Sequence, residues 1–129
     1  MREGEVEVMK KKILLADDSV FVRRLLADIL TGEGYQIIGE VGNGADAVRG
    51  YLDWRPDLVL MGVVMPEVNG IQALAEIRAA DVGTNVIMCS SVSLKEFVTE
   101  ALQHGAREYI FKPFSAEMVL EAVRSCLSE

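Results

Sequence analysis

The sequence is poor in several features that would each point to a particular class of protein. It has one histidine and two cysteines, and these three residues are not spaced as a metal-binding cluster. No apolar stretch approaches membrane-spanning length, and no signal-peptide pattern opens the chain. Basic residues are few, 13 against 20 acidic ones, and the resulting net charge of −7 argues against nonspecific nucleic-acid binding. We therefore expect a protein that acts neither in a membrane nor on nucleic acid.

The composition that remains is typical of one globular domain. The 129 residues are 50% hydrophobic and 26% charged, and a chain of this length can bury a core without disulfides. Cys89 and Cys126 both lie in apolar patterns. We expect each to be a buried, reduced thiol, which suits a cytoplasmic location.

The first residues stand apart from the rest. Residues 1–8 precede a second methionine, Met9, and a run of three lysines. We expect residues 1–10 to form a flexible extension, with Met9 as an alternative start, and residues 11–129 to form the domain. A short additional strand is the alternative, because Val6 and Val8 alternate with acidic residues.

Short apolar runs alternate with amphipathic segments along the domain. The pattern predicts strands over 12–16, 36–41, 57–61, 85–89 and 108–111, and helices over 20–32, 44–54, 70–80, 94–104 and 115–127. Ser19 and Ser115 are placed to cap helices, and Gly105 is placed to end one. Continuous apolar strands are typical of a parallel sheet covered on both faces. The five repeats predict a single-domain, doubly wound α/β fold.

Polar side chains follow three of the predicted strands. Asp17 and Asp18 follow the first strand, Ser90 the fourth and Lys112 the fifth. In such folds the site lies at the carboxyl ends of the strands, so these side chains should meet. Two adjacent carboxylates suit a hard divalent cation. Taken singly, the same residues have plainer explanations: a spare acid before a helix cap, a strand-end serine and a solvated lysine.

Together with Lys112-Pro113-Phe114 and the segment Met65-Pro66-Glu67-Val68-Asn69-Gly70, this arrangement resembles the receiver domain of two-component response regulators. Within that family it is most similar to the CheY-like chemotaxis regulators. The resemblance covers residues 11–128. It implies a flavodoxin-like (βα)5 sheet of order 2-1-3-4-5. It also implies a stand-alone receiver in a phosphorelay, a phosphorylation-controlled protein-binding switch and not an enzyme.

The resemblance also assigns roles to residues. It implies a Mg²⁺ site made by Asp17, Asp18 and the backbone carbonyl of Val64. Ser90 and Lys112 would bind phosphoryl oxygens, and Tyr109 would be the aromatic switch residue. Without the resemblance, Tyr109 is simply a half-buried strand aromatic. The bond between Lys112 and Pro113 is expected to be cis, as is typical of the family.

Gly62 departs from the family pattern, because its position should carry the aspartate that accepts the phosphoryl group. Glycine offers neither that nucleophile nor a third metal oxygen. We therefore expect an intact fold, no phosphorylation at this position, weakened Mg²⁺ affinity, and Lys112 turned towards Asp17 and Asp18. The glycine is either a substitution in an otherwise working regulator or the mark of a natural pseudo-receiver that signals by binding alone.

The partners implied by the resemblance are a histidine kinase and a downstream target, such as a flagellar-motor switch protein, that docks on residues 94–127. His104, in this stretch, is expected on the surface.

Two other classes of function compete with the receiver. Gly42-Asn43-Gly44 fits the glycine-rich pattern of nucleotide- or flavin-binding proteins, but it follows the second strand instead of the first. The plainer reading is a turn that starts a helix. Haloacid-dehalogenase-type phosphatases need a second acid two residues after the first, and Asp17-Asp18-Ser19 lacks it.

Overall fold

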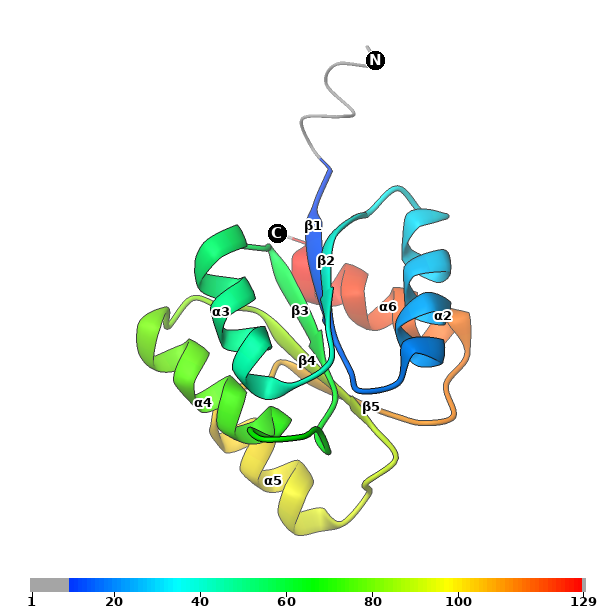
Figure 1. Cartoon of the computed structure of the whole chain (residues 1–129). Helices are drawn as coiled ribbons and strands as arrows, with labels where there is room; N and C mark the ends of the chain where they lie inside the picture. The colour runs from blue at the N-terminus through cyan, green and yellow to red at the C-terminus, as the bar shows by residue number, and fades with distance from the viewer. Residues whose placement is uncertain (1–9, 129) are drawn as a thin grey trace.

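The computed structural model describes residues 10–128, so the interpretation of residues 1–9 as an extension or a strand lies outside the described residues. Within this range, strands and helices alternate as β1 (Lys12–Ala16), α2 (Val20–Thr31), β2 (Gln36–Val41), α3 (Gly44–Trp54), β3 (Leu58–Met61), α4 (Gly70–Ala80), β4 (Val86–Ser90), α5 (Lys95–Gln103), β5 (Glu108–Phe111) and α6 (Ala116–Leu127). The strands form one parallel sheet of order β2-β1-β3-β4-β5 (Figure 1). The predicted topology is confirmed.

Every predicted element is present, and each boundary lies within one residue of its predicted place. Ser19 and Ser115 cap α2 and α6 as predicted: their hydroxyls accept hydrogen bonds of 3.1 Å from the backbone of Val22 and Met118. Two of the shifted boundaries concern residues near the strand ends. Ser90 is the last residue of β4 and does not follow the strand. The helix predicted from residue 94 begins at Lys95, because the backbone of Leu94 is extended, with φ −64° and ψ 133°.

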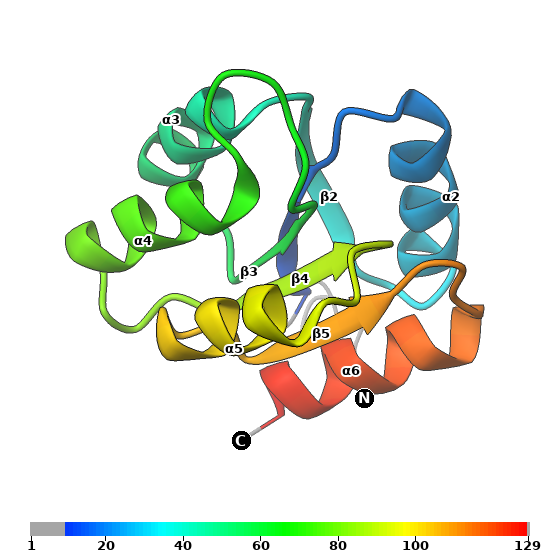
Figure 2. The same ribbon diagram turned by 90° about the horizontal axis from the view of Figure 1, so that it is seen from below.

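The sheet has an apolar core on each face. Figures 1 and 2 show α3, α4 and α5 on one side of the sheet and α2 and α6 on the other. Neighbouring residues of a strand point to opposite faces, so Leu14 packs under the first group of helices and Leu15 under the second. This two-sided burial explains why the strands are continuous apolar runs. Cys89 and Cys126 are buried and free, as predicted.

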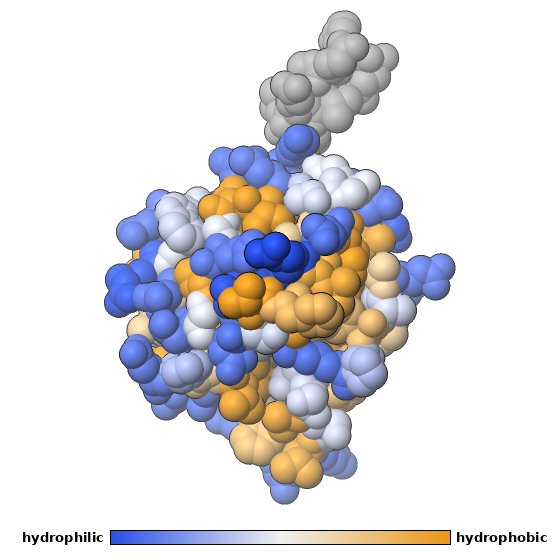
Figure 3. All heavy atoms as spheres, turned by 45° about the vertical axis from the view of Figure 1, so that its right-hand side comes forward, coloured by the Kyte–Doolittle hydropathy of each residue, from blue (hydrophilic) through white to orange (hydrophobic). Residues whose placement is uncertain are grey.

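The outer surface is mixed. On α2 the side chains of Val20, Phe21 and Leu25 are exposed. Figure 3, turned so that the α2 side comes forward, shows apolar patches between polar areas on this face. None of the helices within residues 10–128 is long and apolar enough to cross a membrane.

Backbone hydrogen bonds continue past the strand ends and hold the loops that follow them in register. The amide of Asp17 donates to Val41 at 3.0 Å, and the amide of Gly62 donates to Ala16 at 2.8 Å. At the ends of β4 and β5, the amide of Lys112 donates to the carbonyl of Ser90 at 3.0 Å. The residues that follow β1, β3 and β5 are thereby fixed at one edge of the sheet, at the lower end in Figure 1.

Gly70 fixes the loop between β3 and α4. Its amide donates to Val63 at 2.8 Å, and its α-carbon lies so close to Gly62 that an added Cβ would overlap the Gly62 carbonyl oxygen. That oxygen belongs to the backbone and cannot rotate away. A side chain at residue 70 would therefore push the end of β3 and the start of α4 apart.

We predict that Gly70→Ala destabilises the protein by about 2 kcal/mol, because overpacking against backbone atoms forces them to shift. Urea denaturation followed by circular dichroism measures the loss. Gly83→Ala is the matched control: an added Cβ there meets nothing closer than a side-chain oxygen of Asp81 at 3.5 Å. It should change stability by less than about 0.5 kcal/mol. Equal effects of the two changes would show that the Gly70 contact does not matter.

Candidate functional site

Six of the residues singled out in the sequence line one hollow of about 170 Å³ at the carboxyl edge of the sheet. They are Asp17, Asp18, Gly62, Val64, Ser90 and Lys112, and the hollow is completed by Val63 and Ser91. Tyr109 is not among the lining residues and borders a different hollow, between β5 and α6. Pro113 follows Lys112 through a cis peptide bond, as expected from the resemblance.

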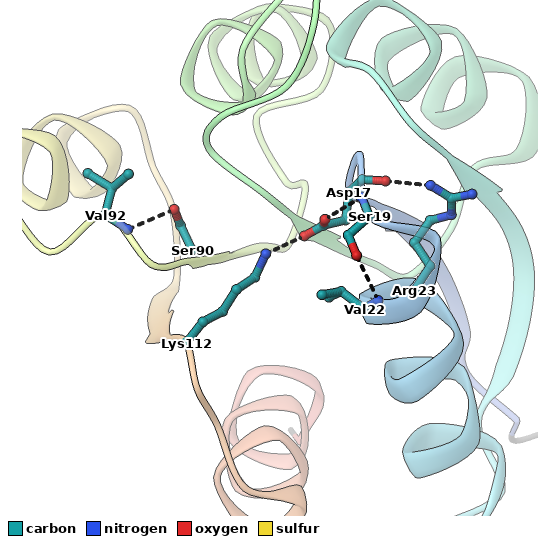
Figure 4. A network of polar contacts seen from close by, with 7 residues as sticks. All are labelled: Asp17, Ser19, Val22, Arg23, Ser90, Val92 and Lys112. Carbon is teal, nitrogen blue, oxygen red and sulfur yellow. Dashed lines mark hydrogen bonds and ion pairs between the residues drawn. The ribbon is translucent and has the colours of Figure 1, made fainter.

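Asp17 is the most enclosed charged group of the site, with 4% of its side chain exposed. Its Oδ1 accepts a hydrogen bond of 2.9 Å from the Ser19 amide, and its Oδ2 accepts one of 2.8 Å from Nζ of Lys112. Figure 4 shows the lysine reaching across the carboxyl edge of the sheet to this carboxylate. The expected turn of Lys112 is confirmed for Asp17; Asp18 is not among its partners in the described residues.

Arg23 also holds Asp17, and sequence reasoning did not single it out. Its Nη1 donates to the backbone carbonyl of Asp17 at 2.6 Å, and its Nε donates to Glu40 at 3.1 Å (Figure 4 shows the first contact). Only 15% of the arginine side chain is exposed. Arg23 therefore ties the loop after β1 to the edge strand β2. The sequence shows an arginine one turn into the predicted helix. It does not show the partner of that arginine, because the acceptor is a backbone atom.

The side chains do not fit a divalent cation as they are arranged. Both oxygens of the Asp17 carboxylate already accept hydrogen bonds, and Asp18 is exposed. Within residues 10–128, no group of three histidine, cysteine or acidic side chains is placed to hold a metal ion. Hard divalent cations need several oxygen ligands, and here Asp18 is the one carboxylate of the hollow without a recorded partner.

Ser90 and Tyr109 both form hydrogen bonds with the loop between β4 and α5. The hydroxyl of Ser90 accepts a hydrogen bond of 3.1 Å from the amide of Val92, and the hydroxyl of Tyr109 donates to the carbonyl of Val92 at 2.6 Å. Burial raises the pKa of Tyr109, while a hydrogen bond with Ser90 lowers it in part. The two predicted residues thus meet at Val92, which the sequence gave no reason to single out.

Cys89 lies directly before Ser90 and is 1% exposed. Burial raises the pKa of its thiol to about 11, although the positive charge of Lys112 opposes the shift. A thiol with so high a pKa is a poor nucleophile at neutral pH. Cys89 is therefore a buried residue of the core, with little thiolate at neutral pH.

Gly42-Asn43-Gly44 proves to be a helix start. The Asn43 side chain caps α3 by accepting from the amide of Asp46 at 2.8 Å. An added Cβ on Gly44 would overlap the backbone of Val68, so the loop before α4 already covers this glycine. The geometry favours the helix turn and gives no support to a dinucleotide site.

The sequence-family model for the response regulator receiver domain matches residues 13–124 of this chain. The chain belongs to this family. Among curated relatives, the chemotaxis protein CheY of Bacillus subtilis (strain 168) is 43% identical over 120 residues, which is 93% of this chain and 100% of the relative. The chemotaxis protein CheY of Thermotoga maritima is also 43% identical, over 115 residues, covering 89% of this chain and 96% of the relative.

Solved structures give the same family. The CheX-CheY-BeF3-Mg complex from Borrelia burgdorferi contains a chain that matches with a TM-score of 0.89 and 34% identity, covering 92% of this chain and 90% of that one. The receiver domain of Thermotoga maritima CheB matches with a TM-score of 0.86 and 32% identity, over 93% of this chain and 98% of that one. The fold is therefore that of a CheY-like receiver, and two-component signalling is the setting of the family.

We predict that Tyr109→Phe loosens the loop at residues 91–94, because the carbonyl of Val92 loses its hydrogen bond. Loss of one such bond costs about 1 kcal/mol. Hydrogen exchange of the loop amides, read by mass spectrometry, should become faster. Tyr35→Phe is the control, since no hydrogen bond of the Tyr35 hydroxyl is recorded among residues 10–128. Unchanged exchange in Tyr109→Phe would mean that the bond does not hold the loop.

We predict that Cys89 resists alkylation in the native protein. With a pKa of about 11, roughly one thiol in a thousand is ionised at pH 8. A Cys126→Ser variant leaves Cys89 as the sole thiol, and its reaction with iodoacetamide, followed by mass, should be slow at pH 8 and speed up as the pH rises towards 11. Reaction at the rate of the urea-unfolded chain would contradict this.

Proposed function

We propose that this protein acts as a receiver of a two-component pathway that regulates its partner by binding, and that Gly62 leaves it without a phosphoryl acceptor. The observation that carries the proposal is the place of Gly62. It follows β3 directly and lines the same hollow as Asp17, Asp18, Ser90 and Lys112. A phosphoryl-receiving site has a carboxylate nucleophile, and position 62 is where the family pattern would supply it.

The other residues keep the roles that the resemblance assigns them. We propose Ser90 and Lys112 as ligands of phosphoryl oxygens, because a hydroxyl and an ammonium beside one hollow suit such charge. The resemblance implies Asp17, Asp18 and the Val64 carbonyl as Mg²⁺ ligands. Because both oxygens of Asp17 already accept hydrogen bonds and residue 62 offers no carboxylate, we propose that Mg²⁺ binds this chain weakly. The Mg²⁺ in the Borrelia burgdorferi complex supports Mg²⁺ as the ion by analogy.

Tyr109 is the proposed link between this hollow and the partner surface. Its hydroxyl reaches the loop that follows Ser90, and Tyr109 is also one of the residues that line a second hollow of about 420 Å³ between β5 and α6. A shift of the loop would therefore reach a residue that lines the second hollow. Phe111 and Met118 line it as well, and both are about half exposed.

The partner surface that we propose is residues 94–127. Apolar side chains exposed there are Leu94, Phe97, Leu102, Phe111 and Met118, as expected where a partner protein docks. A histidine kinase and a downstream target such as a flagellar-motor switch protein are the partners by family analogy. The Borrelia burgdorferi chain is bound to CheX, which supports protein binding as the output. A cytoplasmic location follows from the same analogy.

We predict that the protein gains no phosphoryl group at this hollow when it is incubated with acetyl phosphate and Mg²⁺, because glycine has no carboxylate to form an acyl phosphate. Intact-mass spectrometry is the measurement. Gly62→Asp should gain one phosphoryl group, and Gly62→Ala, the matched control, should gain none. A Cβ at residue 62 would lie 3.1 Å from Oδ2 of Asp17, so that carboxylate must shift by a few tenths of an ångström in both variants.

Two results would contradict the proposal. A phosphoryl group on the parent protein, mapped by peptide analysis to this hollow, would show that another residue serves as acceptor. An unmodified Gly62→Asp variant that folds like the parent would show that more than the acceptor is missing.

A further inference from the structure

Strand β5 is the last strand of the sheet, and its outer edge has no strand partner among residues 10–128. Its inner edge pairs in parallel with β4. No hydrogen bond recorded in the described range joins the backbone of residues 108–111 to a segment other than β4. Backbone groups at a free strand edge bond to water or to a strand that another chain adds. Figure 2 shows β5 lying between α5 and α6.

The second hollow follows this free edge. Residues 108–111 of β5 line it together with Met118, Glu121, Ala122 and Ser125 of α6. Neighbouring side chains of a strand point to opposite faces of the sheet, so a hollow bordered by four consecutive residues follows the edge of the strand. The four α6 residues have the i, i+3, i+4, i+7 spacing of one helix face. We call this hollow the β5–α6 groove.

The charges of the β5–α6 groove are of one sign. Glu108 and Glu121 are its charged lining residues, and none of the eight lining residues is basic. Glu121 is exposed and Glu108 is half-buried, so both can meet a partner. Apart from Ser125, the other lining residues are aromatic or aliphatic. Complementary charge selects partners at an interface, so a segment that is both basic and apolar suits this groove.

The two faces of β5 offer different contacts. Ile110 belongs to the core under α2 and α6, and Tyr109 packs against the core under α3, α4 and α5. Because side chains alternate, Glu108 shares the face of Ile110, and Phe111 shares that of Tyr109. The ring centroids of Tyr109 and Phe111 lie 5.1 Å apart. A strand added beside β5 would meet a carboxylate on one face and two aromatic rings on the other.

Other occupants suit the groove less well. A helix keeps its backbone hydrogen bonds within itself, so it cannot pair with a strand edge. In a symmetric pair of this chain, Glu108 and Glu121 of one copy would lie close to those of the other, and like charges repel. The stretch Glu5-Val6-Glu7-Val8 alternates as a strand does, but its charges are acidic.

We propose that the β5–α6 groove binds an extended segment of a partner protein, which adds to the sheet as a strand beside β5 and alternates basic with apolar residues. The basic residues face Glu108 and Glu121, and the apolar residues face the rings of Tyr109 and Phe111. The inference deepens the proposed function and rests on it in one respect, the docking of a partner protein on residues 94–127.

The test uses an amidated peptide, Lys-Val-Lys-Val-Lys-Val, with a fluorescent label at its N-terminus. Fluorescence anisotropy should show that it binds the whole protein at low ionic strength and binds more weakly as KCl is added. On binding, amide hydrogen exchange should slow in residues 108–111 and stay unchanged in β2, the other edge strand. Protection of β2 in place of β5, or no binding at millimolar peptide, would overturn the proposal.

Two double variants test the charges of the groove. Glu108→Gln combined with Glu121→Gln removes both charges and should weaken peptide binding about fivefold at low salt, as expected for two exposed ion pairs. Glu96→Gln combined with Glu117→Gln is the matched control. It removes two exposed acids that do not line the groove, and it should weaken binding less than about twofold. An equal loss in both double variants would show that net charge alone is responsible and would overturn the proposal.

The backbone contact is tested on the parent protein, so the result does not depend on any variant folding. A peptide methylated at every backbone nitrogen keeps its charges but cannot donate to a strand edge, and it should bind at least about tenfold more weakly. Equal binding would overturn strand addition. The acidic peptide Glu-Val-Glu-Val-Glu-Val should not bind, and its binding would overturn the charge argument.

Failure of this proposal and failure of the proposed function give different results. Exchange protection confined to α5 would overturn the groove as the binding site, while partner docking on residues 94–127 would stand. No phosphodonor is used, so a phosphoryl group found on the parent protein would contradict the proposed function and leave the peptide results standing.

Discussion

The buried carboxylate of Asp17 is the constraint around which the site is arranged. An unpaired charge at 4% exposure would cost several kcal/mol, so the fold must bring a cation to it. The cation comes from Lys112, 95 residues further along the chain. Two strands, β3 and β4, separate β1 from β5 in the sheet, and the long lysine side chain reaches across that distance. The ion pair therefore connects the end of β1 to the end of β5 across the hollow.

Much of this was predictable from the sequence, because the strand ends carry the site. Continuous apolar runs indicated where the strands lie. Two serines indicated where α2 and α6 begin, and their hydroxyls do cap these helices. In a parallel sheet all carboxyl ends lie at one edge, so Asp17, Ser90 and Lys112 had to meet once the strands were placed. The family resemblance supplied the strand order, which local periodicity cannot give. The hollow then contains six of the predicted residues.

What the sequence could not predict are contacts whose acceptor is a backbone atom. Arg23 donates to the carbonyl of Asp17, and Tyr109 donates to the carbonyl of Val92. A carbonyl is present at every residue, so no residue type marks the place where such a bond will form. The start of α5 was misplaced for a related reason. Leu94 has no side-chain acceptor, and the helix begins where the backbone turns, without a capping residue to mark it.

Helix α5, which has no side-chain cap, also has the fewest buried residues of the helices in the described range. Ala101 is the one buried residue of α5, whereas α4 and α6 each bury five. Segments with few buried apolar contacts open at the lowest free energy, so the part of the proposed partner surface nearest Ser90 is the part most easily moved. The bond from Tyr109 to Val92 opposes that movement, and it joins the edge strand β5 to the loop in front of α5.

The backbone around Gly62 explains how the fold can persist without a carboxylate there. The amide of Gly62 is held by Ala16, and its carbonyl lies directly against Gly70. Neither contact involves a side chain at residue 62. The position of the loop is therefore set by the sheet and by Gly70, while the chemistry of the hollow depends on what is attached to that fixed backbone. Because the two are separate, the side chain at residue 62 can change the chemistry of the hollow while the backbone of the loop stays in place.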